Sequence, residues 1–266
     1  MTKSSFSSWA AGLLLLGTLL FAGTVAAQEP AIGELTRKGE EAYLAKKYKT
    51  AVEYFTTAAE QGDAQAQYRL GECYYFKRGV KRNYKKAVDW CEKAAEEGIG
   101  GAQYILGACH FKGKGTEKDL DKAFLWFTKA AQNGIVQAQK EVGSCYANGW
   151  GTEANDSLAA QWFEVAAKQG EAEAQFILGA CYYDGKGVEK NLEKAFFWYR
   201  KAAYQDLAEA QYFLGMCYYS GEGVEQDNTQ SAHWLHKALE NGLDGDRGTL
   251  ARDMIRRIER PSSTLR

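Results

Sequence analysis

Small and hydrophobic residues recur along this chain with a period of 36 residues, and each period contains two segments with helical spacing. In one period Ala174, Leu178 and Cys181 lie at positions i, i+4 and i+7, so they share one face of a helix. Further along, Ala195 and Trp198 begin a second apolar face. No run of strand length alternates with period two. The pattern therefore predicts two amphipathic helices per period and no β-sheet.

Five such units follow one another without an insertion, which indicates an array of repeats. They comprise residues 63–98, 99–134, 135–170, 171–206 and 207–242. A shorter, atypical unit at about 33–62 precedes them. A last amphipathic segment follows, with Leu250, Met254, Ile255 and Ile258 at helical spacing. Since each helix pair has only one apolar face, we expect successive pairs to bury that face against one another.

The connections between the paired helices have their own sequence pattern. A glycine pair such as Gly185 and Gly187 ends the first helix, because glycine accepts the positive φ that a tight turn requires. An Asn or Asp then precedes the second helix, where its side chain can accept hydrogen bonds from free backbone amides. These predicted caps are Asn83, Asp119, Asn155, Asn191 and Asp227. Lys77 stands where the other units have the first turn glycine.

The repeated motif A-Q-x-x-L-G-x-x-Y, G-x-G-V, K-A, W-[FY]-x-K-A-A resembles the Sel1-like repeat, a relative of the tetratricopeptide repeat. It covers roughly residues 33–242, for example as Ala174-Gln175, Leu178-Gly179, Gly185-Lys186-Gly187-Val188 and Trp198-Tyr199. The resemblance implies an all-α fold, a right-handed α-solenoid of helix-turn-helix repeats. It also implies a concave surface that binds other proteins, with a partner that differs from member to member.

The domain organisation follows from these patterns. Residues 1–27 predict a signal peptide: one charge at Lys3, an apolar run over 10–22, and small residues before a cleavage site after Ala27. We expect a tetratricopeptide-like capping repeat over 28–62, five Sel1-like repeats over 63–242, and a capping helix with a tail over 243–266. The mature chain is then periplasmic or secreted, without a membrane span.

The net charge and the absence of known catalytic motifs exclude several classes of function. The formal net charge is −1 and no basic stripe is expected to recur along the repeats, which argues against nucleic acid as a partner. Signatures of serine acyl transfer and of a P-loop are missing from the sequence. His233 and His236 share a helix face, but only Glu240 is suggested nearby as a third ligand, so no metal site is predicted. We expect no cofactor, no catalytic residue and no enzymatic activity.

Six cysteines in an exported chain raise the question of disulfides. Cys73, Cys109, Cys145, Cys181 and Cys217 recur at 36-residue intervals, whereas Cys91 stands alone. Neighbouring helices lie ~8–10 Å apart, too far for the recurring five to bridge in series. Two outcomes stay open. All six serve as small buried residues, or Cys91 forms one bridge, with Cys73 preferred over Cys109.

The partner-binding surface is expected on the first helices of the units, at positions i, i+4 and i+7. Aromatic rings at the outer two positions surround a mostly small residue, and Lys140 interrupts the row. Rings that only pack against the next hairpin are the alternative interpretation. The candidate binding residues are Tyr68, Tyr75, Tyr104, Phe111, Lys140, Phe176, Tyr183, Tyr212 and Tyr219. Lys140 is expected to hold an acidic group of the partner.

These features favour an exported, non-enzymatic adaptor that binds a protein or peptide in the groove. Two alternatives remain. One is a cell-wall or β-lactam-binding or hydrolysing protein, akin to cysteine-rich Sel1-like relatives. The other is a structural subunit that associates with its own copies.

Overall fold

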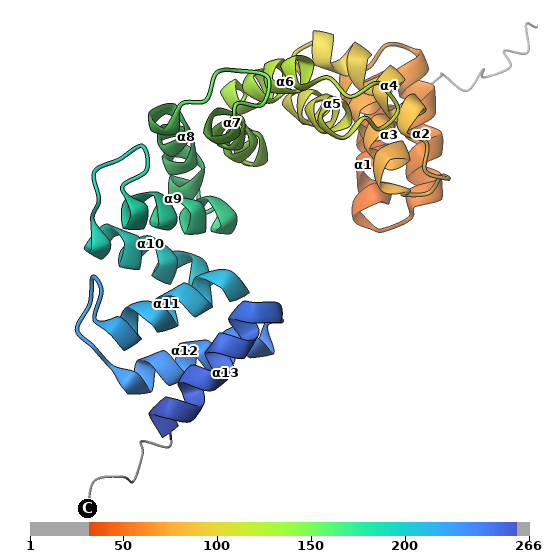
Figure 1. Ribbon diagram of the computed structural model, residues 1–266. Helices are drawn as coiled ribbons and strands as arrows, with labels where there is room; N and C mark the ends of the chain where they lie inside the picture. Colours follow the sequence, from red (N-terminus) through yellow and green to blue (C-terminus); the bar gives the residue numbers. More distant parts are fainter. Residues whose placement is uncertain (1–31, 260–266) are drawn as a thin grey trace, which may run out of the picture. The chain divides into compact units, whose positions relative to one another are not determined.

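The computed structural model describes residues 32–259, and the predicted signal peptide at 1–27 lies outside them. The described residues form thirteen helices and no strand (Figure 1). Their bounds are α1 Ile32–Leu44, α2 Tyr48–Glu60, α3 Ala64–Phe76, α4 Tyr84–Glu96, α5 Gly100–Lys112, α6 Leu120–Gln132, α7 Val136–Asn148, α8 Asp156–Lys168, α9 Ala172–Asp184, α10 Leu192–Ala203, α11 Ala208–Ser220, α12 Asn228–Glu240 and α13 Gly245–Glu259. None of these helices combines the length and the apolar character that crossing a bilayer requires.

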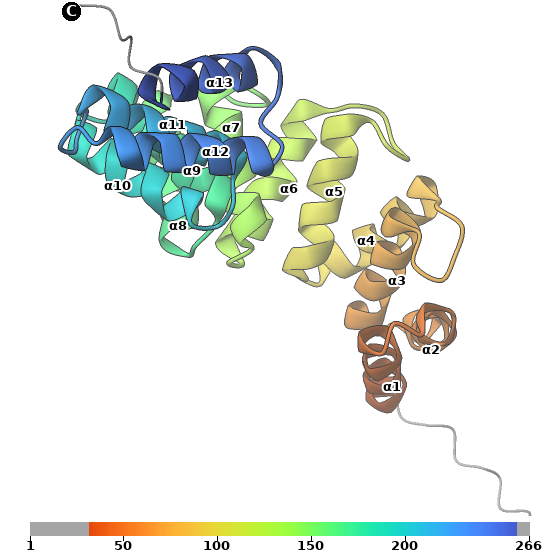
Figure 2. The same cartoon turned by 90° about the horizontal axis from the view of Figure 1, so that it is seen from below.

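The twelve helices α1–α12 form six hairpins, each made of an odd-numbered A helix and an even-numbered B helix. Every helix packs against the helix before it and the helix after it, which confirms the predicted α-solenoid. The thirteenth helix, α13, lies against α12 and closes the last hairpin (Figures 1 and 2). The buried core clusters are built from residues 35–255, so this unit has a complete core of its own.

The turn chemistry confirms the predicted helix ends. In five B helices the predicted Asn or Asp cap accepts a hydrogen bond from the third residue of the helix, as Asn191 does from the amide of Lys194 at 2.8 Å. At the end of α9, Gly185 has φ +73°. Lys77 occupies the equivalent position in the first full repeat with φ +63°, a conformation that L residues rarely adopt.

A glycine inside each A helix allows close contact with the partner B helix. A Cβ atom on Gly107 would lie 2.5 Å from Cδ1 of Phe127, and one on Gly179 would lie 2.7 Å from Cδ1 of Tyr199. Because both rings are buried, the two helices of a hairpin can approach this closely only where the A helix has no side chain.

A buried glutamine in each of the four A helices α5, α7, α9 and α11 then joins neighbouring repeats. Nε2 of Gln103 donates to the carbonyl of Ala95 in α4, and Nδ2 of Asn133 after α6 donates to Oε1 of Gln103 at 2.8 Å. The same bonds recur around Gln139, Gln175 and Gln211. Each link therefore spans three successive helices and satisfies a buried amide.

All six cysteines are buried free thiols, so the bridge between Cys73 and Cys91 considered above is not formed. The two residues belong to different core clusters, and the sulfur of Cys91 fills the space beside Gly71, where a Cβ would lie 2.5 Å away. Here Cys91 takes the place that Phe127 and Tyr199 have in later repeats. Burial raises the pKa of Cys73 and Cys109 to about 12.

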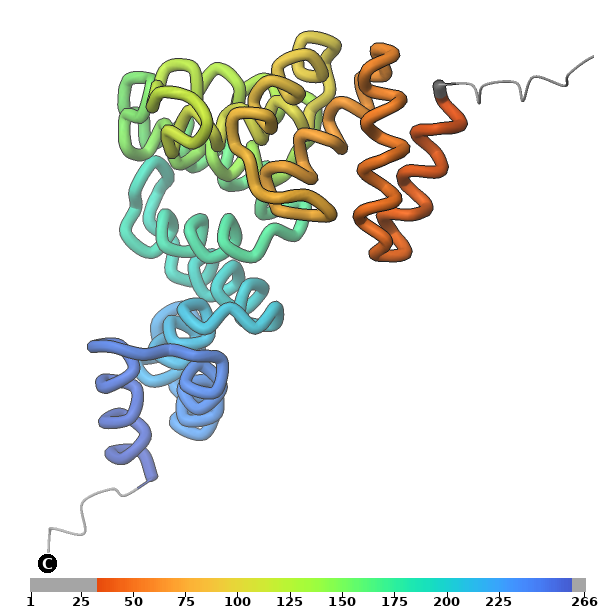
Figure 3. The backbone as a smooth tube through the Cα atoms, turned by 90° about the vertical axis from the view of Figure 1, so that its right-hand side faces the viewer, coloured from red at the N-terminus to blue at the C-terminus, as the bar shows by residue number. Residues whose placement is uncertain are grey.

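The A-to-B connections lie along one edge of the unit, because each rests on the preceding hairpin. A Cβ on Gly79 would lie 2.3 Å from the carbonyl oxygen of Tyr48, the first residue of α2. Gly115 has the same relation to Tyr84, the first residue of α4. Figure 3 shows the α1–α2 turn and the α3–α4 connection at the same edge. Successive connections are therefore in direct contact along this edge.

Candidate functional site

The A helices form the inner layer of the unit, and the candidate residues lie on them. Neighbouring A helices contact each other directly, α1 with α3 and α3 with α5, more extensively than any two B helices of the described chain. Two clefts open on this A-helix layer. We call them the N-terminal cleft and the central cleft.

The N-terminal cleft lies between α3 and α5 and has a volume of about 420 Å³. Three of the predicted residues line it together: Tyr68 and Tyr75 from α3, and Tyr104 from α5. The predicted middle positions, Glu72 and Ala108, line it as well. The helical spacing i, i+4, i+7 places the three α3 residues on one face, so the sequence pattern correctly predicts which side chains meet here.

A buried carboxylate gives this cleft its polarity. Glu72 receives bonds from two guanidinium groups, from Nη1 of Arg69 at 3.0 Å and from Nη1 of Arg78 at 3.3 Å. Burial raises the pKa of Glu72, whereas the hydrogen bond from Arg69 opposes the shift. Arg69 also bonds Glu40 on α1 at 2.6 Å. Since the four charges compensate one another, the cleft offers aromatic surface with a neutral ion-pair network at its floor.

The rings of the predicted row also pack within the protein. The Tyr104 ring centroid lies 5.9 Å from that of Phe127, and the Phe111 ring lies 5.0 Å from Trp150. Phe176 lies 5.5 Å from Phe213 of the next A helix. The rings therefore pack within and between hairpins, and most keep part of their surface accessible.

Two predicted residues have other roles in the structure. Tyr212 is only 6% exposed and belongs to a core cluster with Met254 and Ile255 of α13, so its ring lies beneath the capping helix. The ammonium group of Lys140 forms ion pairs with Glu173 and, at 3.5 Å, with Glu141. Burial lowers the pKa of Lys140, but its bond to Glu173 and the charges of the nearby glutamates together raise it overall. An acidic group of a partner would have to compete with these two carboxylates.

The remaining two predicted rings lie at the ends of their A helices. The hydroxyl of Tyr183 donates to Oε2 of Glu222 in the α11–α12 connection at 3.0 Å, a contact between neighbouring repeats. Tyr219 is half-buried and packs on the cluster under α13. Only part of the surface of each ring is therefore accessible to a partner.

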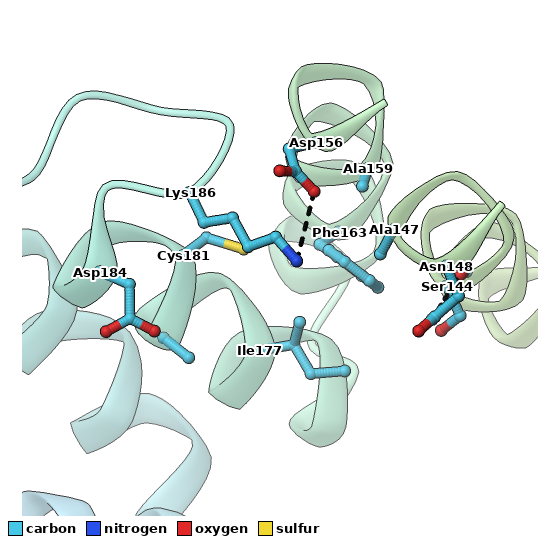
Figure 4. Close-up of a pocket in the computed structure, with 11 residues that line it drawn as sticks. Ser144, Ala147, Asn148, Asp156, Ala159, Phe163, Ile177, Cys181, Asp184 and Lys186 are labelled. Carbon is cyan, nitrogen blue, oxygen red and sulfur yellow. Dashed lines mark hydrogen bonds and ion pairs between the residues drawn. The ribbon is translucent and has the colours of Figure 1, made fainter. Parts of the chain in front are cut away.

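The central cleft, of about 240 Å³, lies between α7, α8 and α9 (Figure 4). It exists because Ala147 stands where other repeats carry the ring of Tyr75, Phe111, Tyr183 or Tyr219. Phe163 and Ile177 form apolar walls. Lys186 from the α9–α10 connection reaches over the cleft to Asp156 of α8 at 3.3 Å, as Figure 4 shows.

The chemistry of the central cleft suits binding more than reaction. Its one thiol, Cys181, has a pKa raised by burial to about 11, so it is protonated and a poor nucleophile near neutral pH. Asp184, Ser144 and Asn148 supply polar atoms at the rim. The sequence pattern marks Lys140 as a break in the row of rings but does not indicate the cleft beside Ser144 and Ala147. The small residue Ala147 could have indicated the cleft, because a small side chain in a row of rings leaves the volume of one ring unfilled.

Within residues 32–259 no group of three or more His, Cys, Asp or Glu side chains is arranged to hold a metal ion. His236 instead pairs with Glu259 of α13, Nε2 to Oε1 at 2.9 Å, and His233 is exposed.

The fold and its clefts define a class of protein: an α-solenoid of stacked helix pairs, generally a non-catalytic scaffold for protein interactions. The Sel1 repeat model matches residues 32–63, 64–99, 101–135, 136–171, 172–207 and 208–243, so the chain belongs to the Sel1 repeat family. Residues 32–63, the unit expected to resemble a tetratricopeptide repeat, are thus matched as a sixth Sel1 repeat.

Two solved structures are similar over most of the chain. A Sel1 repeat protein from Oxalobacter formigenes is 31% identical with a TM-score of 0.76, covering 87% of this chain and 91% of the other. A protective antigen of uropathogenic Escherichia coli strains, with an SLR fold, is 32% identical with a TM-score of 0.80. The match covers 87% of this chain but only 49% of that antigen. No curated protein sequence matches the chain.

Proposed function

We propose that this chain is a non-enzymatic adaptor that binds a protein or peptide segment on its A-helix layer. The observation that carries the proposal is the N-terminal cleft, where Tyr68, Tyr75 and Tyr104 converge on a compensated ion-pair floor. Tyrosine rings offer a large contact area at low conformational cost, which favours recognition of side chains along an extended or helical segment.

The central cleft adds a second anchor point on the same layer. Its walls of Phe163 and Ile177 fit an apolar side chain, and Asp184 is available at the rim to accept a hydrogen bond from a partner's backbone or basic group. A partner that spans α3 to α9 therefore engages aromatic surface at one end and an apolar socket further along. Two such anchors give more specificity than either cleft alone.

We also propose that the adaptor works outside the cytoplasm, in the periplasm or after secretion. The support is the composition of residues 1–27, with one basic residue, an apolar run and small residues before Ala27. N-terminal sequencing of the chain recovered from a cell envelope fraction tests this step. A mature N-terminus at Gln28 supports export, and an intact Met1 contradicts it.

The binding proposal is tested by filling each cleft with residues that the chain itself uses at the same repeat positions. Ala147→Tyr restores the ring found in four other repeats, and Ala108→Met copies Met216. Gln161→Tyr, on the exposed face of α8, is the matched control that adds a ring elsewhere. Peptides are first selected from a random displayed library on the native chain, and their affinities are then measured by calorimetry.

Loss of affinity in a cleft-filling variant, with full affinity in the control, supports the proposal. Equal affinity in all three variants places the binding surface elsewhere and contradicts it. If no peptide is selected and the native chain forms concentration-dependent oligomers in sedimentation, self-association is the better explanation. Stable retention of a labelled β-lactam by the pure chain would instead favour the cell-wall alternative.

A further inference from the structure

Charge is distributed unevenly along the edge formed by the A-to-B connections. In the first three hairpins, residues 45–49, 76–86 and 112–122 contain three, six and four Lys or Arg residues, thirteen against only three Asp or Glu. The equivalent segments of the last three hairpins, 148–158, 184–194 and 220–230, contain three basic and eight acidic residues. The near-zero net charge of the whole chain therefore conceals a basic edge on its first half.

The three basic connections form one continuous surface, which we call the basic edge. Gly79 rests on the backbone of Tyr48, and Gly115 rests on that of Tyr84, so each connection touches the preceding hairpin. Side chains join them as well. The Lys114 ammonium lies 5.1 Å from the Tyr84 ring centroid, which belongs to the preceding hairpin.

Most cations of the basic edge have no acidic partner in the described chain. Ion pairs are formed by Arg78 with Glu72, by Lys85 with Asp89 at 3.9 Å and by Lys122 with Asp119 at 3.5 Å. The other ten are in no ion pair within the described residues: Lys46, Lys47, Lys49, Lys77, Lys81, Arg82, Lys86, Lys112, Lys114 and Lys118. A surface of unpaired like charges repels itself and favours an anionic partner.

Helix stability does not explain why these lysines lie at the starts of the first B helices. Lys49 lies in the first turn of α2, and Lys85 and Lys86 in the first turn of α4, where the helix dipole favours acidic residues. Three of the four later B helices, α6, α8 and α10, follow the favourable rule, with Asp121, Asp156 and Glu193 in their first turns. The first two hairpins thus carry a charge pattern that opposes their own helix dipoles.

Two large apolar side chains project from the same edge. Leu44 at the end of α1 is 78% exposed, and Phe76 at the end of α3 is 46% exposed. In the later hairpins the position of Phe76 is held by Lys112, Asn148, Asp184 and Ser220, which are polar. The half-buried rings of Tyr48 and Tyr84 lie beside the cations. Exposed apolar side chains among lysines, with tyrosines alongside, are typical of proteins that lie on a bilayer surface.

We propose that the basic edge, formed by the α1–α2, α3–α4 and α5–α6 connections, docks the protein on an anionic phospholipid bilayer. Lysines and arginines contact the acidic headgroups, while Leu44 and Phe76 enter the headgroup boundary. The acidic connections of the last three hairpins are repelled by the same surface, so the first half of the array makes the contact. Phe76 and Lys112 also line the N-terminal cleft, so the basic edge borders that cleft.

A bilayer fits these observations better than two other anionic partners. A nucleic acid would use the cations but leave Leu44 and Phe76 without an apolar environment. The acidic connections of a second copy could pair with the basic edge, but the single apolar cleft beside Asn148 and Asp184 would take only one of the two exposed apolar side chains. Both partners are included as outcomes of the test.

The test uses residues 28–266, which contain the complete core and lack the apolar N-terminal run. Binding is measured by co-sedimentation with vesicles of phosphatidylcholine alone or with about one third phosphatidylglycerol. Each Lys or Arg at an anionic surface contributes roughly five-fold in affinity. We therefore expect Lys46→Gln/Lys47→Gln/Lys81→Gln/Arg82→Gln to weaken binding by about 100-fold or more. Raising the salt concentration should weaken the native chain similarly.

The matched control removes four exposed lysines from the later repeats: Lys168, Lys190, Lys194 and Lys201, each to Gln. It has the same net charge as the edge variant and should bind almost as the native chain does. Leu44→Ser/Phe76→Ser should weaken binding at high salt, where the apolar contribution dominates. Circular dichroism verifies that each variant is folded.

Three results would overturn the proposal. One is equal vesicle binding by the edge variant and its control. Another is binding that does not depend on phosphatidylglycerol. The third is no vesicle binding by the native chain, whether or not it binds a DNA duplex or its own copies through the basic edge.

Discussion

Gly107→Ala places a methyl group in the closest helix contact of the second full repeat. The added Cβ would lie 2.5 and 2.6 Å from two ring atoms of Phe127, far inside the usual contact distance of about 3.5–4 Å. The ring is only 3% exposed, and it also contacts the rings of Tyr104 and Phe111, so it has little room to move away. The α5–α6 hairpin must therefore open slightly.

The expected cost results from two opposing effects. Replacing a helical glycine by alanine stabilises a helix by up to about 1 kcal/mol. Overpacking of a dense core costs about 1–3 kcal/mol, and an overlap of this size belongs at the upper end of that range. We expect a net loss of about 2 kcal/mol in the free energy of unfolding. For a chain of this length the melting temperature should fall by about 4–8 °C.

Thermal and urea unfolding followed by circular dichroism measure this change, and two further variants separate overpacking from other effects. Gly33→Ala in α1 is the control, because no atom lies within 4 Å of the position a Cβ would take; it should be neutral or slightly stabilising. In a Phe127→Leu background the Gly107→Ala change should cost about 1 kcal/mol less, since the ring is gone. If Gly107→Ala were stabilising, or its cost were the same in both backgrounds, the packing argument would be refuted.

Three other expectations follow from the turns and the buried thiols. Lys77→Gly should stabilise the chain by about 0.5–1 kcal/mol in urea unfolding, because it relieves a positive φ; a loss of stability would contradict the strain. Asn191→Ala should cost about 1 kcal/mol, since the first amides of α10 lose their side-chain acceptor, whereas Asn191→Asp should not. Burial raises the pKa of the thiols, so the folded state keeps protons that the unfolded state loses above its ordinary value near 9. The free energy of unfolding should therefore fall as the pH rises from about 9 towards 12. Aromatic disulfide reagents should label no thiol in the folded chain at pH 8. Rapid labelling of the native protein, or a free energy of unfolding that is unchanged up to about pH 11, would contradict this. The affected residues are Cys73, Cys91, Cys109, Cys145, Cys181 and Cys217.

Local sequence patterns predict the fold well here because each repeat contains the residues that form its own helices and turns. The glycine pair, the Asn or Asp cap and the helical spacing act within about twelve residues, and the caps at Asn83 and Asp227 form as expected. The N-terminal cleft follows from the same spacing, since Tyr68, Glu72 and Tyr75 share one helix face. Contacts of this kind need no knowledge of distant residues.

Features that depend on two repeats at once are harder to predict from the sequence. Lys140 pairs with Glu173, which is 33 residues away and differs from its counterparts in some repeats. Tyr212 is buried because α13 follows the last repeat, and nothing within that repeat indicates this. The central cleft depends on the absence of a ring at Ala147, and a missing side chain gives a weaker sequence signal than one that is present.

The glutamine links have a consequence for how such a chain can change its length. Each link starts at the end of one B helix, passes through the glutamine of the next A helix and ends at the Asn or Gln that follows the next B helix. Because the links at Gln103, Gln139, Gln175 and Gln211 use the same bonds, one such link can replace another. Removing or duplicating one 36-residue unit within 99–242 should therefore leave the new junction fully hydrogen-bonded. The array can therefore lengthen or shorten by whole units. A unit added or removed between the two clefts changes the distance between them and reuses the existing interface between repeats.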